Sequence, residues 1–187
     1  ESNFADETHR GLWTIADQSG TYTSYKFEWD DAAQAFVVID GTKTSTNSNL
    51  DDWLITPPLY IVDEATYTIS MEVKAYGGTS PYSDSSPVYS IYIGNSSKPA
   101  DFINKGTSIV RKEKLNKEEE YATYTHSFSL TPQAEQGAHA ASRADADEYN
   151  ISKKFMAFRF GEKYTTAYPY VEVRKISIGT NISTGIE

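Results

Sequence analysis

The chain has 187 residues, of which 39% are hydrophobic and 23% charged, with a net charge of −9 and no cysteine. This length allows one domain with a hydrophobic core. The negative charge disfavours nucleic acids and anionic membrane surfaces as partners, because both attract clustered Lys and Arg. The missing cysteine excludes disulfides and thiolate chemistry, and no apolar run reaches the roughly 20 residues of a membrane-spanning helix.

Runs of alternating apolar and polar residues recur along the chain and predict β-strands. The clearest is TYTISMEVKAY (66–76), which keeps a period of two throughout. Turn-rich stretches separate the runs, so the sequence predicts an all-β antiparallel sandwich or barrel in a single domain, 1–187. The predicted strands are Leu12–Ala16, Tyr25–Trp29, Ala35–Ile39, Trp53–Ile55, Thr66–Tyr76, Val88–Ile93, Tyr121–Leu130, Phe155–Phe160 and Tyr170–Ile178.

Three segments depart from this pattern. Residues 98–106 predict a short helical turn, because Pro99 suits a first helical position. Residues 133–150 are rich in Ala and polar residues and predict a surface insertion. In VEVRKISI (171–178) the apolar residues are spaced by two, three and two, which predicts a β-bulge at Arg174 or Lys175.

The stretch DDWLITPP (51–58) combines two acids, a tryptophan and two prolines. Strand alternation places Trp53 and Ile55 on one face, which we expect to be the core face, and Leu54 on the other. Pro57 and Pro58 lack backbone donors, so we expect them to end hydrogen bonding at a sheet edge.

Three stretches in order, LWTIAD (12–17), DDWLITPPL (51–59) and VEVRKISIG (171–179), carry a family likeness. With them the chain resembles the cleaved-adhesin, or choice-of-anchor, jelly-roll domains of Bacteroidetes surface and secreted proteins. The resemblance implies a galactose-binding-like jelly-roll β-sandwich, an extracellular or cell-surface location, and further domains in the same polypeptide. TGIE (184–187) fits the start of a linker to such a domain.

The same resemblance implies a structural calcium ion held by carboxylates of loops and strand ends. The two acids of the family's closing strand are replaced here by Arg174 and Lys175, and cations repel Ca²⁺. We therefore expect that calcium position to be lost. Asp17, Asp51 and Asp52 remain candidate ligands for a different calcium site, and no other cofactor is expected.

Catalytic patterns are sparse in this sequence. The best acidic cluster on a strand is FEWDD (27–31), which runs into a turn rather than facing a second carboxylate, as a glycosidase requires. His126 shares a predicted strand face with Tyr124 and Phe128, which indicates a partly buried structural histidine. There is no nucleophile elbow and no phosphate-binding loop. We therefore expect no enzyme activity.

Tyrosine is abundant, with 14 residues, and its ring stacks on the apolar faces of sugars. Tyr76 and Tyr82 flank a long predicted loop, and Tyr164 and Tyr168 lie near Pro169. Loops at one end of a sandwich often carry binding sites. These four tyrosines are the candidate ligand-binding residues.

The sequence thus predicts a non-catalytic adhesion or carbohydrate-binding-like module of an exported bacterial surface protein, with a glycan or a host or partner protein as its ligand. Two alternatives stay open. One is an architectural spacer without a ligand of its own, and the other is a glycan-active hydrolase with two carboxylates converging in a cleft.

Overall fold

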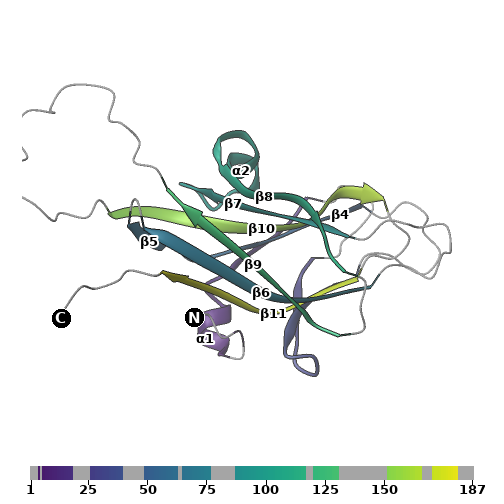
Figure 1. Cartoon of the computed structure of the whole chain (residues 1–187). Coiled ribbons are helices and arrows are strands. Elements are labelled where there is room, and N and C mark those ends of the chain that lie inside the picture. The colour runs from purple at the N-terminus through teal and green to yellow at the C-terminus, as the bar shows by residue number, and fades with distance from the viewer. Residues whose placement is uncertain are drawn as a thin grey trace, which may run out of the picture.

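Two antiparallel β-sheets pack face to face in the computed structural model of the chain (Figure 1). The structure describes residues 4, 6–18, 26–39, 49–62, 65–76, 87–116, 120–130, 151–165 and 170–180, without the side chains of 39, 49, 76 and 162–165. The strands are β1 (Thr14–Asp17), β2 (Glu28–Asp30), β3 (Ala35–Ile39), β4 (Asn49–Ile55), β5 (Leu59–Val62), β6 (Thr66–Tyr76), β7 (Val88–Gly94), β8 (Thr107–Lys114), β9 (Ala122–Ser129), β10 (Ile151–Thr165) and β11 (Tyr170–Thr180). The helices are α1 (Glu7–Arg10) and α2 (Pro99–Lys105).

The strand order places segments that are distant in sequence next to each other. One sheet has the order β1-β4-β10-β7-β8, with β5 paired to the start of β10, and the other has the order β2-β3-β11-β6-β9. The chain crosses between the sheets several times, as in the steps from β5 to β6 and from β10 to β11. This arrangement is a jelly-roll β-sandwich, which confirms the predicted all-β fold class.

The hydrophobic core fills the space between the sheets, and β6 shows why. Its apolar residues Tyr67, Ile69, Met71, Val73 and Ala75 are all buried, whereas the residues between them are partly exposed. Each large apolar side chain buried in this way contributes about 1.5–3 kcal/mol. The period of two in the sequence therefore identified the core face of this strand correctly.

A second, smaller cluster lies on the outer face of the six-stranded sheet, beneath α2. Trp53 stacks on Tyr92 with ring centroids 5.8 Å apart and on Phe102 of α2 at 6.2 Å. Trp53 and Ile55 do share a face opposite Leu54, but Leu54 belongs to the core between the sheets. The expectation that Trp53 faces the main core was wrong, because α2 also buries the outer face of β4.

The two prolines of the motif separate β4 from β5. Just before them, the backbone N–H of Thr56 donates to the Met156 carbonyl at 2.9 Å, and the Met156 N–H donates to Thr56 Oγ1 at 3.0 Å. The expected sheet edge is absent, because β4 lies between β1 and β10. Pro57 and Pro58 therefore end an internal strand.

The remaining local predictions have mixed outcomes. Helix α2 lies within the predicted turn, and the register of β11 against β6 shifts between Val173 and Lys175, so Arg174 is the extra residue of the predicted bulge. The strands β5 and β8 and the helix α1 were not predicted. The expected insertion at 133–150 lies outside the described residues.

No helix in the described parts of the chain is both long and apolar enough to cross a bilayer.

Candidate ligand-binding groove on the outer face of the six-stranded sheet

Of the four predicted ligand-binding tyrosines, the structure describes the backbone of two. The backbone of Tyr76 ends β6 and pairs with Tyr170, and the backbone of Tyr164 lies opposite Leu50 near the end of β10. Both positions are at the end of the sandwich where β10 leads into β11. Tyr82 and Tyr168 lie outside the described residues, so a binding role for these four residues stays a prediction.

Tyr170, which neighbours these tyrosines in sequence, is engaged within the fold. Its hydroxyl and that of Tyr121 both donate to the carboxylate of Glu172, the latter at 2.6 Å, and Glu172 is only 6% exposed. The guanidinium of Arg174 lies 4.2 Å from the ring centroid of Tyr121. On the outer face of the five-stranded sheet, these rings therefore serve the fold by satisfying a buried carboxylate.

The three candidate calcium ligands do not converge. Asp17 and Asp52 are register partners in β1 and β4 and share a sheet face, while Asp51 lies on the opposite face of β4. Among the described residues, no three Asp, Glu, His or Cys side chains gather in a way that suits a metal ion. The set Asp17, Asp51 and Asp52 therefore does not fit one calcium coordination shell, which needs six to eight oxygen ligands.

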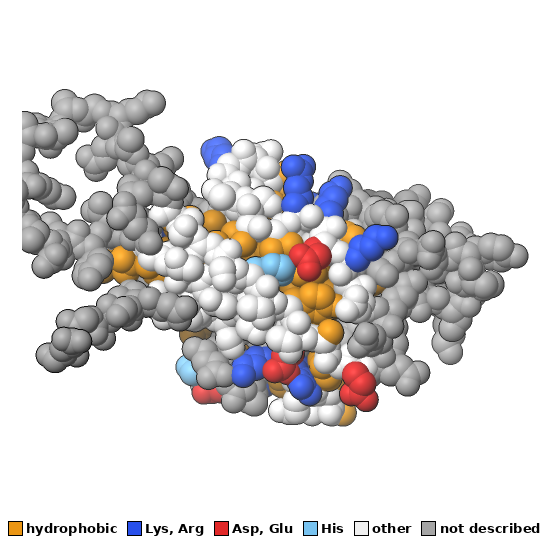
Figure 2. Space-filling view, viewed as in Figure 1, with side chains coloured by type: hydrophobic (Ala, Val, Ile, Leu, Met, Phe, Trp, Pro, Cys, Tyr) orange, Lys and Arg blue, Asp and Glu red, His pale blue; other side chains and the backbone are white. Residues whose placement is uncertain are grey.

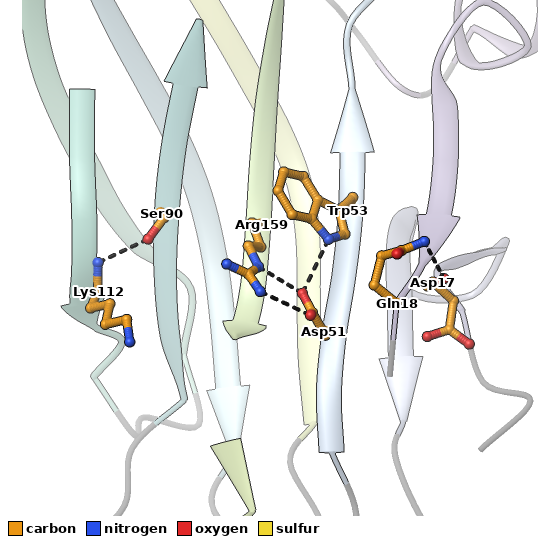
Figure 3. Close-up of polar contacts among 7 residues, drawn as sticks. All are labelled: Asp17, Gln18, Asp51, Trp53, Ser90, Lys112 and Arg159. Atoms are coloured by element: carbon orange, nitrogen blue, oxygen red, sulfur yellow. Dashed lines mark hydrogen bonds and ion pairs between the residues drawn. The ribbon is translucent and has the colours of Figure 1, made fainter. Parts of the chain in front are cut away.

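Asp51 instead anchors a buried polar cluster (Figure 3). Arg159 of β10 donates from Nε to Oδ1 at 2.7 Å and from an Nη to Oδ2 at 2.9 Å, and Trp53 donates from Nε1 to Oδ1 at 3.1 Å. Asp51 is fully buried and Arg159 is 9% exposed. This bidentate geometry is the strongest form of an ion pair. The hydrogen bond from Trp53 Nε1 to the same carboxylate holds the indole ring in place.

Sequence reasoning missed Arg159. Its signal was present, since a cation stands between Phe158 and Phe160 in an otherwise apolar strand, FMAFRF (155–160). A buried cation requires a partner charge, and the partner lies 108 positions away in sequence. Local sequence patterns do not reveal a pair of residues so far apart in the chain.

A groove opens beside this cluster, between α2 and β8. Its volume is about 330 Å³, with Arg159 and Tyr92 contributed by the sheet, Phe102 and Ile103 by the helix, and Ser108 by the edge strand. The remaining described lining is Gly106, Arg111 and Lys112. Ile103 is 53% exposed and Tyr92 9% exposed. The Ser108 hydroxyl donates to the Val110 carbonyl at 3.1 Å, so its oxygen is available as an acceptor. The groove therefore combines an aromatic and apolar wall with a hydroxyl acceptor and cationic donors, which is the composition of many small-molecule sites.

A second group of titratable residues lies where β8 approaches β9. The Tyr89 hydroxyl is 2.7 Å from Nε2 of His126, and Glu113 lies 3.8 Å from the same nitrogen. His126 thus has a polar partner and is half-buried, as predicted. Burial, with a smaller contribution from Glu113, raises the pKa of Tyr89 above the ordinary tyrosine value, so this phenol stays protonated at neutral pH.

A hydrolytic site would need two carboxylates facing each other across a cleft. The described lining of the groove contains no Asp or Glu. Glu113 approaches a histidine rather than another acid. The described residues thus offer no carboxylate pair to the groove.

Comparison with solved structures shows the fold. The chain is similar to the K3 cleaved adhesin domain of Lys-gingipain from Porphyromonas gingivalis, with a TM-score of 0.52 and 14% identity over 90% of this chain and 91% of that one. The K1 cleaved adhesin domain of the same protein gives a TM-score of 0.51 at 16% identity, covering 91% of both chains. A CBM4 structure gives 0.49 at 13% identity, covering 91% of this chain and 95% of the other.

No family model and no curated protein sequence matches the chain. The likeness to the two adhesin domains therefore establishes a shared sandwich fold, in agreement with the resemblance seen in the sequence motifs.

Proposed function

We propose that the chain is a non-catalytic adhesion or carbohydrate-binding-like module of an exported bacterial surface protein. The groove between α2 and β8 is its main ligand site. The observation that carries the proposal is the lining of this groove, where the edge of Tyr92 and the exposed side chain of Ile103 offer apolar surface beside the hydroxyl of Ser108. A sugar presents a matching combination of C–H faces and hydroxyls.

The rigidity of the groove floor supports a binding role. Arg159 and Tyr92 are both held against Trp53, the first through Asp51 and with its guanidinium 5.0 Å from the ring centroid of Trp53, the second by ring stacking. A preorganised surface loses little conformational entropy when a ligand binds. The groove volume of about 330 Å³ is at the lower end of the roughly 300–1,000 Å³ that small-molecule sites span.

The tyrosine-rich end of the sandwich is a proposed second contact region, with Tyr76, Tyr82, Tyr164 and Tyr168 as its candidates. The surface-protein setting and the extracellular location are supported by the fold shared with cleaved adhesin domains. Further domains of the same polypeptide and a host or partner protein belong to the same proposal.

The second candidate is an architectural spacer. It is favoured by the polar groups that are satisfied inside the fold, since Asp51 is paired with Arg159 and Glu172 accepts two tyrosine hydroxyls. A spacer of this kind would bind no glycan. The hydrolase alternative is the weakest of the three, because the described groove lining lacks a carboxylate.

A glycan array with two matched variants tests the proposal. Ser108→Trp fills the groove, whereas Ser127→Trp adds the same side chain at an exposed position of β9 on the other sheet. We expect saturable binding by the wild type and by Ser127→Trp, and a loss of about tenfold or more in Ser108→Trp.

The array is run with calcium and with a chelator, and binding should be equal in both because the three candidate aspartates do not share a site. A blank array for the wild type would overturn the proposal in favour of the spacer. Equal binding by the two variants would show that the ligand lies elsewhere.

A further inference from the structure

The edge strand β8 contains an irregularity that faces the groove. Ile91 pairs with Val110 and Tyr89 pairs with Glu113, so the single residue Ser90 lies opposite two residues, 111 and 112. This is a β-bulge. Lys112 has a φ of 51°, a left-handed conformation that is uncommon for a residue other than glycine.

Ser90 holds the bulge in place. Its hydroxyl oxygen accepts the backbone N–H of Lys112 at 2.9 Å, and Ser90 is fully buried in β7 (Figure 3). The bulge thus has a specific internal support.

The bulge changes which side chains reach the groove. In a regular strand, neighbours 111 and 112 would point to opposite faces and Glu113 would share the face of Arg111. Here Arg111 and Lys112 both line the groove, while Glu113 turns to the inner side near His126. A local irregularity has therefore brought two cations together and removed an acid.

The charge of the groove opposes that of the whole chain. Arg111, Lys112 and Arg159 line it, and its described lining has no acidic residue, although the chain carries a net charge of −9. Arg159 forms an ion pair with Asp51, and the other two cations of the lining are the two residues of the bulge. Figure 2 shows Lys and Arg side chains in a row over β8.

The next inference rests on the proposed function of the groove. We propose that the ligand of the groove is an acidic glycan whose carboxylate or sulfate groups bind Arg111 and Lys112. A guanidinium offers paired donors to a planar carboxylate, and an ammonium adds a point charge. Tyr92, Ile103 and Ser108 supply the contacts to the sugar ring itself. The bulge is thus a specificity device, placed beside a groove that accommodates the sugar.

The test compares polymers that share a sugar backbone but differ in whether the backbone carries charged groups. Polygalacturonate is measured against its fully methyl-esterified form, and dextran sulfate against dextran, by titration with the whole chain. The variant pair is Arg111→Gln with Lys112→Asn, chosen because Asn tolerates the left-handed conformation. The control pair is Lys26→Gln with Arg174→Gln, which removes the same charge from two exposed cations: Lys26 precedes β2, and Arg174 lies in β11 of the other sheet.

We expect the wild type to bind at least one acidic polymer and not its neutral counterpart, with affinity that falls as salt rises. The double variant at 111 and 112 should lose about tenfold or more, because a charge-assisted hydrogen bond is stronger than a neutral one. The control pair should stay within about twofold.

Carboxylate and sulfate are distinguished by which acidic polymer binds, and either result supports the inference. Binding of neutral glycans alone would overturn it while leaving the proposed function intact. Equal loss in both variant pairs would also overturn it, since net charge rather than the bulge would then control affinity. A lack of binding to every glycan would overturn the inference and the proposed function together.

Discussion

At the scale of single residues, Asp51 of the DDW motif forms a buried ion pair, whereas the sequence suggested it as a metal ligand. Asp51 looked like a metal ligand in the sequence, yet in the fold it is fully buried against a guanidinium. The sequence around Asp51 shows a carboxylate next to a tryptophan, but it does not show which group pairs with that carboxylate. The partner, Arg159, comes from another strand, β10. The nature of that partner decides between metal ligand and ion pair.

The buried ion pair of Asp51 and Arg159 predicts that Arg159 contributes far more to the free energy of unfolding than the exposed Arg174 does. Replacing Arg159 with Met leaves the buried carboxylate of Asp51 without its countercharge and should lower the free energy of unfolding by about 3–5 kcal/mol. Replacing Arg174, whose side chain is 47% exposed and which pairs with Glu72, should cost at most about 1 kcal/mol. Denaturant titrations measure both variants, and equal losses would contradict the account.

Tyr89 predicts a pH dependence of stability. Burial and the nearby Glu113 raise the pKa of Tyr89 in the folded state, whereas the unfolded chain ionises this phenol near pH 10. Its contribution is therefore complete below about pH 10 and is lost as the pH rises above that value, by up to ~1.4 kcal/mol per pH unit.

Replacing Tyr89 with Phe removes this titration. We expect the free energy of unfolding of the variant, measured between pH 8 and 11 in roughly half-unit steps, to decline less steeply than that of the wild type. Parallel curves for the two proteins would show that the phenol does not titrate differently in the folded and unfolded states.

At the scale of elements, regular strands could be predicted and irregular ones could not. β6 keeps a strict period of two and was found with its correct bounds. β8 was missed because its two apolar residues, Ile109 and Val110, are adjacent and charged residues follow them. The register of this strand against β7 shifts twice, once beside Ile109 and once at residues 111 and 112. The first shift explains the adjacent apolar pair that hid the strand, and the second shapes the groove.

Local sequence patterns also did not reveal that part of the outer face of the six-stranded sheet is buried. Strand alternation alone assigns Trp53 to the main core, because a strand in a sandwich usually has one dry face. Phe102 of α2, 49 positions further along the chain, covers the other face. Only the position of the helix, which no local pattern reveals, determines the surroundings of this tryptophan.

The end of β10 contains a close approach that only glycine permits. Gly161 has a φ of +93°, and a Cβ there would lie 2.1 Å from the Leu50 carbonyl oxygen of β4. Gly161→Ala should therefore lower the free energy of unfolding by roughly 3 kcal/mol or more.

Gly179 of β11 is the matched control, because a Cβ added there would meet no atom within 4 Å. Its replacement by Ala should change stability by less than about 1 kcal/mol. Denaturation curves of the two variants decide the point, and a Gly161→Ala protein as stable as Gly179→Ala would refute the close approach.

At the scale of the whole molecule, the two faces of the sandwich are used differently. The outer face of the five-stranded sheet satisfies Glu172 with tyrosine hydroxyls, while the outer face of the six-stranded sheet is partly covered by α2 and retains the groove beside it. The chain is acidic overall, and this groove concentrates positive charge. The central claim is that ligand binding takes place there.

The most direct test is an amide NMR titration of the whole chain with the oligosaccharide that the array binds best. The account predicts that the largest saturable shifts fall on α2 and on the groove-facing residues Tyr92, Ser108 and Lys112, with the same dissociation constant at each. Shifts confined to the end of the sandwich that carries Tyr76 and Tyr164, or the absence of any saturable shift, would contradict it.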